Sequence, residues 1–114
     1  MESSPPNVLF VCAKNQWRSP TAAAVYRNDA RINVQSAGLS QASPQTLSEK
    51  LLIWADLVLV MEDAHAARIR KFFRKHCELP EVISLGIPDD YPLMHPDLIA
   101  LVKERTEEVL ETWL

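Results

Sequence analysis

The stretch NVLFVCAKNQWRSPTAAAVYR, residues 7–27, decides the fold of this chain. It opens with an apolar run over residues 7–11, which follows a pair of prolines and predicts a buried strand. Pro20 then introduces an alanine-rich segment, residues 21–27, which predicts a helix with proline in its first turn. A strand that leads through a short loop into a helix is the first unit of an α/β domain.

The junction between this strand and this helix carries a thiol and an arginine. Cys12 stands where the strand ends and Arg18 where the helix begins, with five residues between them. Inward backbone N–H groups and the positive end of a helix together make an anion site, and they draw a thiol toward its thiolate. The planar fork of Arg18 suits two phosphate oxygens. The junction therefore predicts phosphoryl transfer through a cysteine.

Two further side chains support the loop. The loop has no glycine, and Asn15 is the expected substitute because asparagine tolerates the left-handed conformation better than most residues. The Ser19 hydroxyl is placed to stabilise the Cys12 thiolate. The alternative is a merely structural cysteine before an ordinary helix start, and the strand before and the helix after the loop disfavour it.

Length and composition indicate one ordinary globular domain. The 114 residues are 47% hydrophobic and 24% charged, enough for a single core, so we expect one domain over residues 1–114. Residues 1–6 are expected to form a disordered N-terminal tail. The net charge of −3 gives no electrostatic footprint for nucleic acid or an anionic membrane.

The compartment follows from what the sequence lacks. The longest apolar run, residues 57–61, is too short to span a membrane, and the N-terminus has no signal-like segment. Cys12 and Cys77 make no disulfide framework, and no Cys or His spacing indicates zinc. We therefore expect a cytoplasmic protein without a metal or another cofactor.

Strand and helix patterns alternate through the rest of the chain. Further strands are predicted at residues 32–36, 56–61 and 82–85, of which the middle one is apolar on both faces. This alternation predicts a three-layer α/β sandwich, in which a four-stranded parallel sheet has helices on both faces. In such folds ligands bind beyond the carboxyl ends of the strands, where Cys12 stands.

Three further helices are expected, each with an apolar face. The first starts at Ser43-Pro44, the second crosses residues 69–76, and the third begins near Pro96. The residues expected to face the core are Leu47, Leu51, Trp54 and Ala55 in the first helix and Leu98, Leu101, Val102, Val109 and Trp113 in the third. The stripe of the second helix is formed by Ile69, Phe72 and Phe73 and ends at His76.

A proton donor is predicted in the loop after the fourth strand. Asp89 and Asp90 are adjacent there and flanked by prolines, which hold the loop extended. The loop leaves the same edge of the sheet as Cys12, and either aspartate can protonate a leaving oxygen. An ordinary solvated turn is the alternative.

The chain resembles the low-molecular-weight protein tyrosine phosphatases, as a short member. The resemblance rests on the cysteine–arginine–serine–proline loop in its strand–helix context, on Ser36-Ala37-Gly38, on residues 56–62, and on the Pro-Asp-x-Tyr pattern that ends at Tyr91. It implies a cysteine-dependent phosphatase that hydrolyses phosphotyrosine proteins or small aryl phosphates through a phosphocysteine. It implies a catalytic set of Cys12, Arg18 and Asp89, and a substrate-binding set of Ala13, Lys14, Asn15, Gln16, Trp17, Ser19 and Tyr91.

The sequence departs from the family pattern in four places. Lys14 replaces the usual glycine before the loop asparagine, and Asp90 replaces the proline after the acid. Trp17 stands where many members have a second cysteine, so it supplies either a stacking surface for substrate or packing under the Asp89 loop. The stretch over residues 39–55 is shorter than in typical members.

Other functions fit less well. A thiol-coupled arsenate reductase needs a relay of further cysteines, and only Cys77 remains. A phosphocysteine carrier has little use for an arginine clamp with an acid. A phosphotyrosine-binding module without turnover is the non-enzymatic alternative. The three histidines are not predicted as ligands, and His65 and His76 are expected at solvated or rim positions. The basic segment over residues 68–75 is expected to be a solvated face, with docking of an acidic protein as the alternative.

Overall fold

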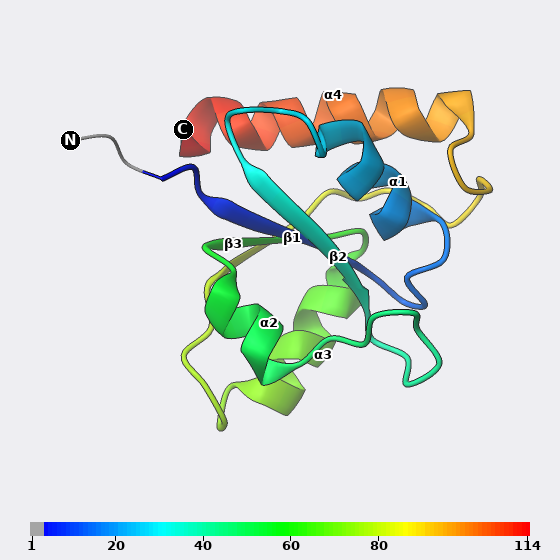
Figure 1. Cartoon of the computed structure of the whole chain (residues 1–114). Coiled ribbons are helices and arrows are strands. Elements are labelled where there is room, and N and C mark those ends of the chain that lie inside the picture. The colour runs from blue at the N-terminus through cyan, green and yellow to red at the C-terminus, as the bar shows by residue number, and fades with distance from the viewer. Residues whose placement is uncertain (1–3) are drawn as a thin grey trace.

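A four-stranded parallel sheet organises the computed structural model, which describes residues 4–114 (Figure 1). The strand order is β2-β1-β3-β4, so the first strand of the chain lies inside the sheet. Strand β1 pairs with β2 on one side and with β3 on the other, and every pairing is parallel. The strands are β1 (Asn7–Cys12), β2 (Asn33–Gly38), β3 (Leu57–Val60) and β4 (Glu81–Ser84).

Helices cover both faces of this sheet. Figure 1 shows α1 and α4 on one face and α2 and α3 on the other. Their bounds are α1 (Arg18–Tyr26), α2 (Glu49–Trp54), α3 (Asp63–Phe73) and α4 (Pro96–Trp113). The three-layer α/β sandwich predicted from the sequence is confirmed.

The central strands are buried on both faces because helices pack on each. In β1, Val8 and Phe10 join the core under α1 and α4, while Leu9 and Val11 join the core under α2 and α3. This alternation follows from the two-residue period of a strand. Continuous burial anchors β1 in the sheet, so Cys12 at its end has a fixed position.

The predicted helix start at Ser43-Pro44 is wrong, because this segment extends along the end of β2. The Gly38 N–H donates to the Gln45 carbonyl at 2.9 Å, and the Leu47 N–H donates to the Gly38 carbonyl at 2.8 Å. Helix α2 begins at Glu49 instead, after Ser48, whose hydroxyl accepts the Leu51 N–H at 3.3 Å. Of the residues expected inside, Leu47 and Ala55 are buried but flank the helix, Leu51 and Trp54 are half-buried, and Leu52 is buried.

The apolar stripe predicted for α3 is displaced around the helix. His65, Ala66 and Ile69 face the core, while Phe72 is 57% exposed and His76 is exposed. The prediction of a solvated or rim position for His65 is therefore wrong. Position along the helix decides this, because His65, Ile69 and the half-buried Phe73 are spaced four residues apart and share one face.

Helix α4 buries residues that its apolar pattern did not single out. Leu98 and Val102 are buried as predicted, but Thr106 and Leu110 complete the inner face. Leu101, Val109 and Trp113, predicted to be buried, are partly buried at its sides. The buried residues of α4 therefore recur every four residues from Leu98 to Leu110, and the third of them is a threonine rather than an apolar residue.

The expected N-terminal tail falls partly outside the described residues, since residues 1–3 are not among them. The carbonyl oxygens of Pro5 and Pro6 accept hydrogen bonds from Asn33 at 3.3 and 2.9 Å. Within residues 4–114, no helix combines the length and apolar character that crossing a membrane requires.

Two isoleucines in helices on the same face test this arrangement. Ile69 is fully buried in α3, whereas Ile53 in α2 is 70% exposed. We expect Ile69→Ala to lower the free energy of unfolding by about 2–5 kcal/mol, because it leaves a cavity in the core. Ile53→Ala, the matched control, should change it by less than about 0.5 kcal/mol. Urea unfolding measures both, and equal losses would contradict the packing.

Candidate active site

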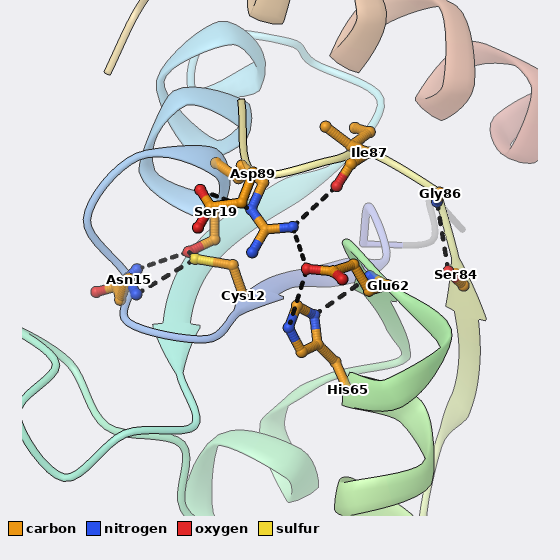
Figure 2. A network of polar contacts seen from close by, with 10 residues as sticks. Cys12, Asn15, Ser19, Glu62, His65, Ser84, Gly86, Ile87 and Asp89 are labelled. Carbon is orange, nitrogen blue, oxygen red and sulfur yellow. Dashed lines mark hydrogen bonds and ion pairs between the residues drawn. The ribbon is translucent and has the colours of Figure 1, made fainter. Parts of the chain in front are cut away.

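The Cys12 sulfur lies at the carboxyl end of β1, directly before the loop that leads into α1. Its Sγ atom is 3.0 Å from the Ser19 hydroxyl and accepts the Asn15 N–H at 3.2 Å. Cys12 and Ser19 are both buried. Figure 2 shows the three side chains clustered together. The sulfur of the candidate nucleophile is therefore within hydrogen-bond distance of two polar groups, a backbone N–H and a hydroxyl.

Asn15 turns the loop, as the sequence predicted, with a φ of 54° in the left-handed region. Its amide Nδ2 donates to the hydroxyls of Ser19 and Ser36 at 2.9 and 3.0 Å. Its Oδ1 accepts the Gln45 N–H at 3.2 Å. A buried side chain with partners on three segments holds the loop in this conformation. The role of Ser36 was not predicted, although its place in the family-like Ser36-Ala37-Gly38 stretch was a signal for it.

Gly38 allows the loop to approach the end of β2. A Cβ atom at this position would lie 2.8 Å from the Asn15 nitrogen and 2.8 Å from the Lys14 carbonyl carbon. Backbone atoms at that distance have to move, so any larger residue at Gly38 displaces the loop. The loop contains no glycine, but it depends on Gly38 at the end of β2 for the space that it occupies.

The Arg18 side chain is a buried charge with fixed partners. It is 3% exposed, and its Nη1 donates to the Glu62 carboxylate at 2.6 Å and to the Ile87 carbonyl at 2.9 Å. Its Nε lies 3.6 Å from Asp89 Oδ1. Because Nη1 is engaged, the guanidinium offers its Nε–Nη2 edge to a tetrahedral anion, which suits two-oxygen contact.

Glu62 was not predicted as a functional residue. It caps α3 directly after β3, and its N–H donates to His65 Nδ1 at 3.2 Å in a reciprocal capping arrangement. The hydrogen bond from Arg18 holds the pKa of the Glu62 carboxyl below its usual range. Burial, and then the Arg18 charge, lower the pKa of His65, which fits a neutral ring whose Nδ1 accepts. An acid at the carboxyl end of the strand beside β1 was the available signal.

The loop after β4 brings Asp89 to this site. The chain turns at Gly86, whose φ is 64°, and the Arg105 guanidinium donates to the Leu85 and Gly86 carbonyls at 2.9 and 3.3 Å. Farther along, the Met94 N–H donates to the Thr21 hydroxyl at 2.9 Å. The loop is thus tied to α4 at one end and to α1 at the other.

Cys12, Arg18 and Asp89 lie around one hollow of about 190 Å³. Trp17 is 45% exposed at its rim. Asp90 and Tyr91 do not line it, and the Tyr91 ring lies 5.5 Å from the His95 ring. Asn15 and Ser19 are buried beside the hollow and hold the loop and sulfur. The residues that line the hollow are Cys12, Ala13, Lys14, Gln16, Trp17, Arg18 and Asp89.

No protein-family model matches the chain, and no curated protein matches it in sequence. Solved structures do match. The YwlE arginine phosphatase from Geobacillus stearothermophilus is 25% identical, with a TM-score of 0.68, over 95% of this chain and 94% of that one. A low molecular weight protein tyrosine phosphatase from Streptococcus pyogenes is 14% identical, with a TM-score of 0.77, over 96% and 93%. The chain has the fold of the low-molecular-weight protein tyrosine phosphatases.

This low-molecular-weight phosphatase fold extends over nearly the whole chain, so the family resemblance seen in the sequence is confirmed. The tyrosine phosphatase Wzb from Escherichia coli K30 was solved in complex with phosphate, and it is 20% identical to this chain. Its TM-score is 0.72, over 94% of this chain and 97% of that one. The three structures described here are phosphatases by name, which is the enzyme class expected for this chain. Among residues 4–114, no group of three or more His, Cys, Asp or Glu is arranged to hold a metal ion.

The ion pair between Arg18 and Glu62 predicts a pH dependence of stability. Because Arg18 lowers the pKa of folded Glu62, the pair contributes stability above the ordinary glutamate value of 4.5 and loses it as the pH falls through the lowered value. We therefore expect Glu62→Gln to be less stable at about pH 6, with a gap that closes toward about pH 3.

Urea unfolding at a series of pH values measures this gap. Glu108→Gln, which changes an exposed glutamate of α4, is the matched control and should leave the pH profile of the protein unchanged. A gap that stays constant with pH for Glu62→Gln would contradict the coupling between this carboxylate and Arg18.

Proposed function

We propose that the chain hydrolyses phosphate monoesters of phenols, either phosphotyrosine in proteins or small aryl phosphates, through a phosphocysteine. The observation that carries this proposal is the convergence of Cys12, Arg18 and Asp89 on one hollow. The three groups come from β1, from the start of α1 and from the loop after β4. They are the nucleophile, the clamp and the acid that two-step phosphoryl transfer requires.

In the first step the Cys12 thiolate attacks phosphorus, so an S–P bond forms and the bond from phosphorus to the phenolic oxygen breaks. The Nε–Nη2 edge of Arg18 and the N–H groups at the start of α1 stabilise the charge on the other oxygens. Asp89, when protonated, gives its proton to the departing oxygen. The leaving group therefore departs as a neutral phenol, and Asp89 is left as a carboxylate.

In the second step water attacks phosphorus and the S–P bond breaks. The Asp89 carboxylate takes a proton from this water, and Cys12 leaves as a thiolate that the Ser19 hydroxyl and the Asn15 N–H stabilise. Inorganic phosphate is released and the starting state is restored. The proposed steps use only side chains of this chain and water.

The rim of the hollow supports an aryl substrate. An exposed indole such as that of Trp17 offers a flat surface on which a phenyl ring stacks. Tyr91 follows in the Asp89 loop, where its ring packs against His95. Lys14 and Gln16 complete the rim with polar groups. We place the activity in the cytoplasm, where Cys12 stays reduced.

Replacing the nucleophile tests the mechanism. We expect Cys12→Ser to abolish hydrolysis of an aryl phosphate, because serine has no accessible anionic form at neutral pH. Vanadate or phosphate should still bind this variant, since the loop and Arg18 remain. Cys77→Ser, which changes a half-buried thiol beyond α3, is the matched control and should keep its activity. A phosphoenzyme trapped on any other residue would refute the role of Cys12.

The two adjacent aspartates test the acid. Asp89 lines the hollow beside Arg18 and Asp90 does not, so Asp89→Asn should lower kcat by roughly 10²–10⁴-fold. The loss should shrink for substrates with more acidic leaving groups, which need less help from a proton. Asp90→Asn removes the same charge one residue away and should have little effect. A crippled Asp90→Asn with a mild Asp89→Asn would reverse the assignment and leave the cysteine mechanism intact.

A further inference from the structure

Positive charge is concentrated on α3 and on the turn that follows it. Residues 68–75 carry five of the chain's 12 Lys and Arg residues and none of its 15 Asp and Glu residues. Helix α4, on the opposite face of the sheet in Figure 1, carries acidic residues, among them Glu104, Glu107, Glu108 and Glu111. A chain with a net charge of −3 therefore has a basic segment on α3, which favours acidic partners.

A groove of about 540 Å³ opens beside this basic segment. Its apolar wall is made by Leu39 and Leu47 on one side and by Phe72 and Phe73 of α3 on the other. The Phe72 ring is 57% exposed, which is unusual for so large an apolar group. An exposed aromatic ring at the side of a groove is a typical anchor point for an apolar side chain of a partner.

Two cations flank this ring. Arg68 lines the groove, and Lys71 and Phe72 follow it by three and four residues, so all three lie on one face of α3. Both cations are exposed. A partner that contacts Phe72 through an apolar side chain thus meets Arg68 and Lys71 beside it. Glu49, whose carboxylate lies 3.8 Å from His76 Nδ1, also lines the groove. Acidic residues next to that apolar residue complement the surface.

One side of the groove lies next to the loop of the active site. Leu39, in its wall, donates its N–H to the Cys12 carbonyl at 3.1 Å, and the next residue, Ser40, donates to the Ala13 carbonyl at 2.8 Å. The segment that forms one side of the groove is therefore bonded directly to the anion-binding loop. A peptide whose phosphorylated residue enters the hollow at Cys12 has this groove as an adjoining surface.

We propose that this groove binds the acidic, apolar-containing segment that flanks the phosphorylated residue of a protein substrate. The inference rests on the proposed function and adds a substrate class to it, namely acidic phosphoproteins. The apolar residue packs on Phe72, and carboxylates pair with Arg68 and Lys71. Such exposed pairs contribute little individually, so their main effect is on the rate and specificity of encounter.

Kinetics with three substrates tests the proposal. One is a phosphotyrosine peptide with flanking Glu-Leu-Glu, the second has Gln-Leu-Gln in its place, and the third is a small aryl phosphate. We expect Arg68→Gln with Lys71→Gln to lower kcat/KM for the acidic peptide by roughly three- to tenfold at low salt. The effect should fade as salt is added, because these charges are exposed. The other two substrates should be unaffected.

Matched controls separate the groove from general charge effects. Arg27→Gln with Lys103→Gln removes two exposed cations, one at the end of α1 and one in α4. This double variant should leave kcat/KM for all three substrates unchanged. Phe72→Ser should weaken turnover of both peptides and spare the aryl phosphate, whereas Ile53→Ser changes an apolar side chain outside the groove and should spare all three. Equal effects of the two double variants on the acidic peptide would overturn the proposal.

Direct binding keeps this test independent of turnover. A fluorescent, unphosphorylated Glu-Leu-Glu peptide should bind the protein in an anisotropy titration at low salt, and the Arg68→Gln, Lys71→Gln variant should bind it roughly three- to tenfold more weakly. Turnover of the aryl phosphate without such binding would overturn the docking proposal alone, and binding without any turnover would overturn the phosphatase proposal alone. A salt-sensitive dimer that the same variant disrupts, measured by ultracentrifugation, would assign the groove to a second copy's acidic α4 instead.

Discussion

The buried guanidinium of Arg18 is the constraint around which the site is organised. A charge that is 3% exposed needs a partner, and Glu62 at the end of β3 supplies it. The Ile87 carbonyl, which follows β4, accepts from the same nitrogen. One side chain thus connects the start of α1 with the ends of two other strands. An intact buried ion pair contributes little net stability, whereas removal of one partner is strongly destabilising. The main contribution of the Arg18–Glu62 pair is therefore to orient the guanidinium.

This orientation has a chemical consequence. Glu62 and Ile87 accept hydrogen bonds from Nη1 and hold the guanidinium in one orientation. Its Nε–Nη2 edge therefore needs no rearrangement before an anion binds. Preorganised donors of this kind are the main source of electrostatic stabilisation in enzymes. Asp89 lies near the same edge at 3.6 Å, so the acid and the clamp share one small volume.

The anion loop shows how a turn is built without glycine. Asn15 adopts a left-handed conformation that costs free energy for a non-glycine residue, and its side chain recovers that cost through three hydrogen bonds to Ser19, Ser36 and Gln45. Gly38, in β2, removes the side chain that would otherwise meet the loop from behind. The catalytic loop is therefore shaped by β2 and by the segment after it as much as by its own residues.

The α/β class, the strand–loop–helix unit around Cys12 and Arg18, and the left-handed Asn15 could all be predicted from the amino-acid sequence. These features are local, because the strand, the loop and the first helical turn are contiguous. The spacing of their apolar residues and the helix start signal all lie within residues 7–27. Four features follow from the packing of the folded chain. Glu62 pairs with Arg18, His65 is buried, Phe72 is exposed, and Asp89 rather than Asp90 lines the hollow. Those outcomes depend on β3 lying beside β1 and on the direction in which the β4 loop returns, and strand order is a property of the packed sheet that no single stretch of sequence contains.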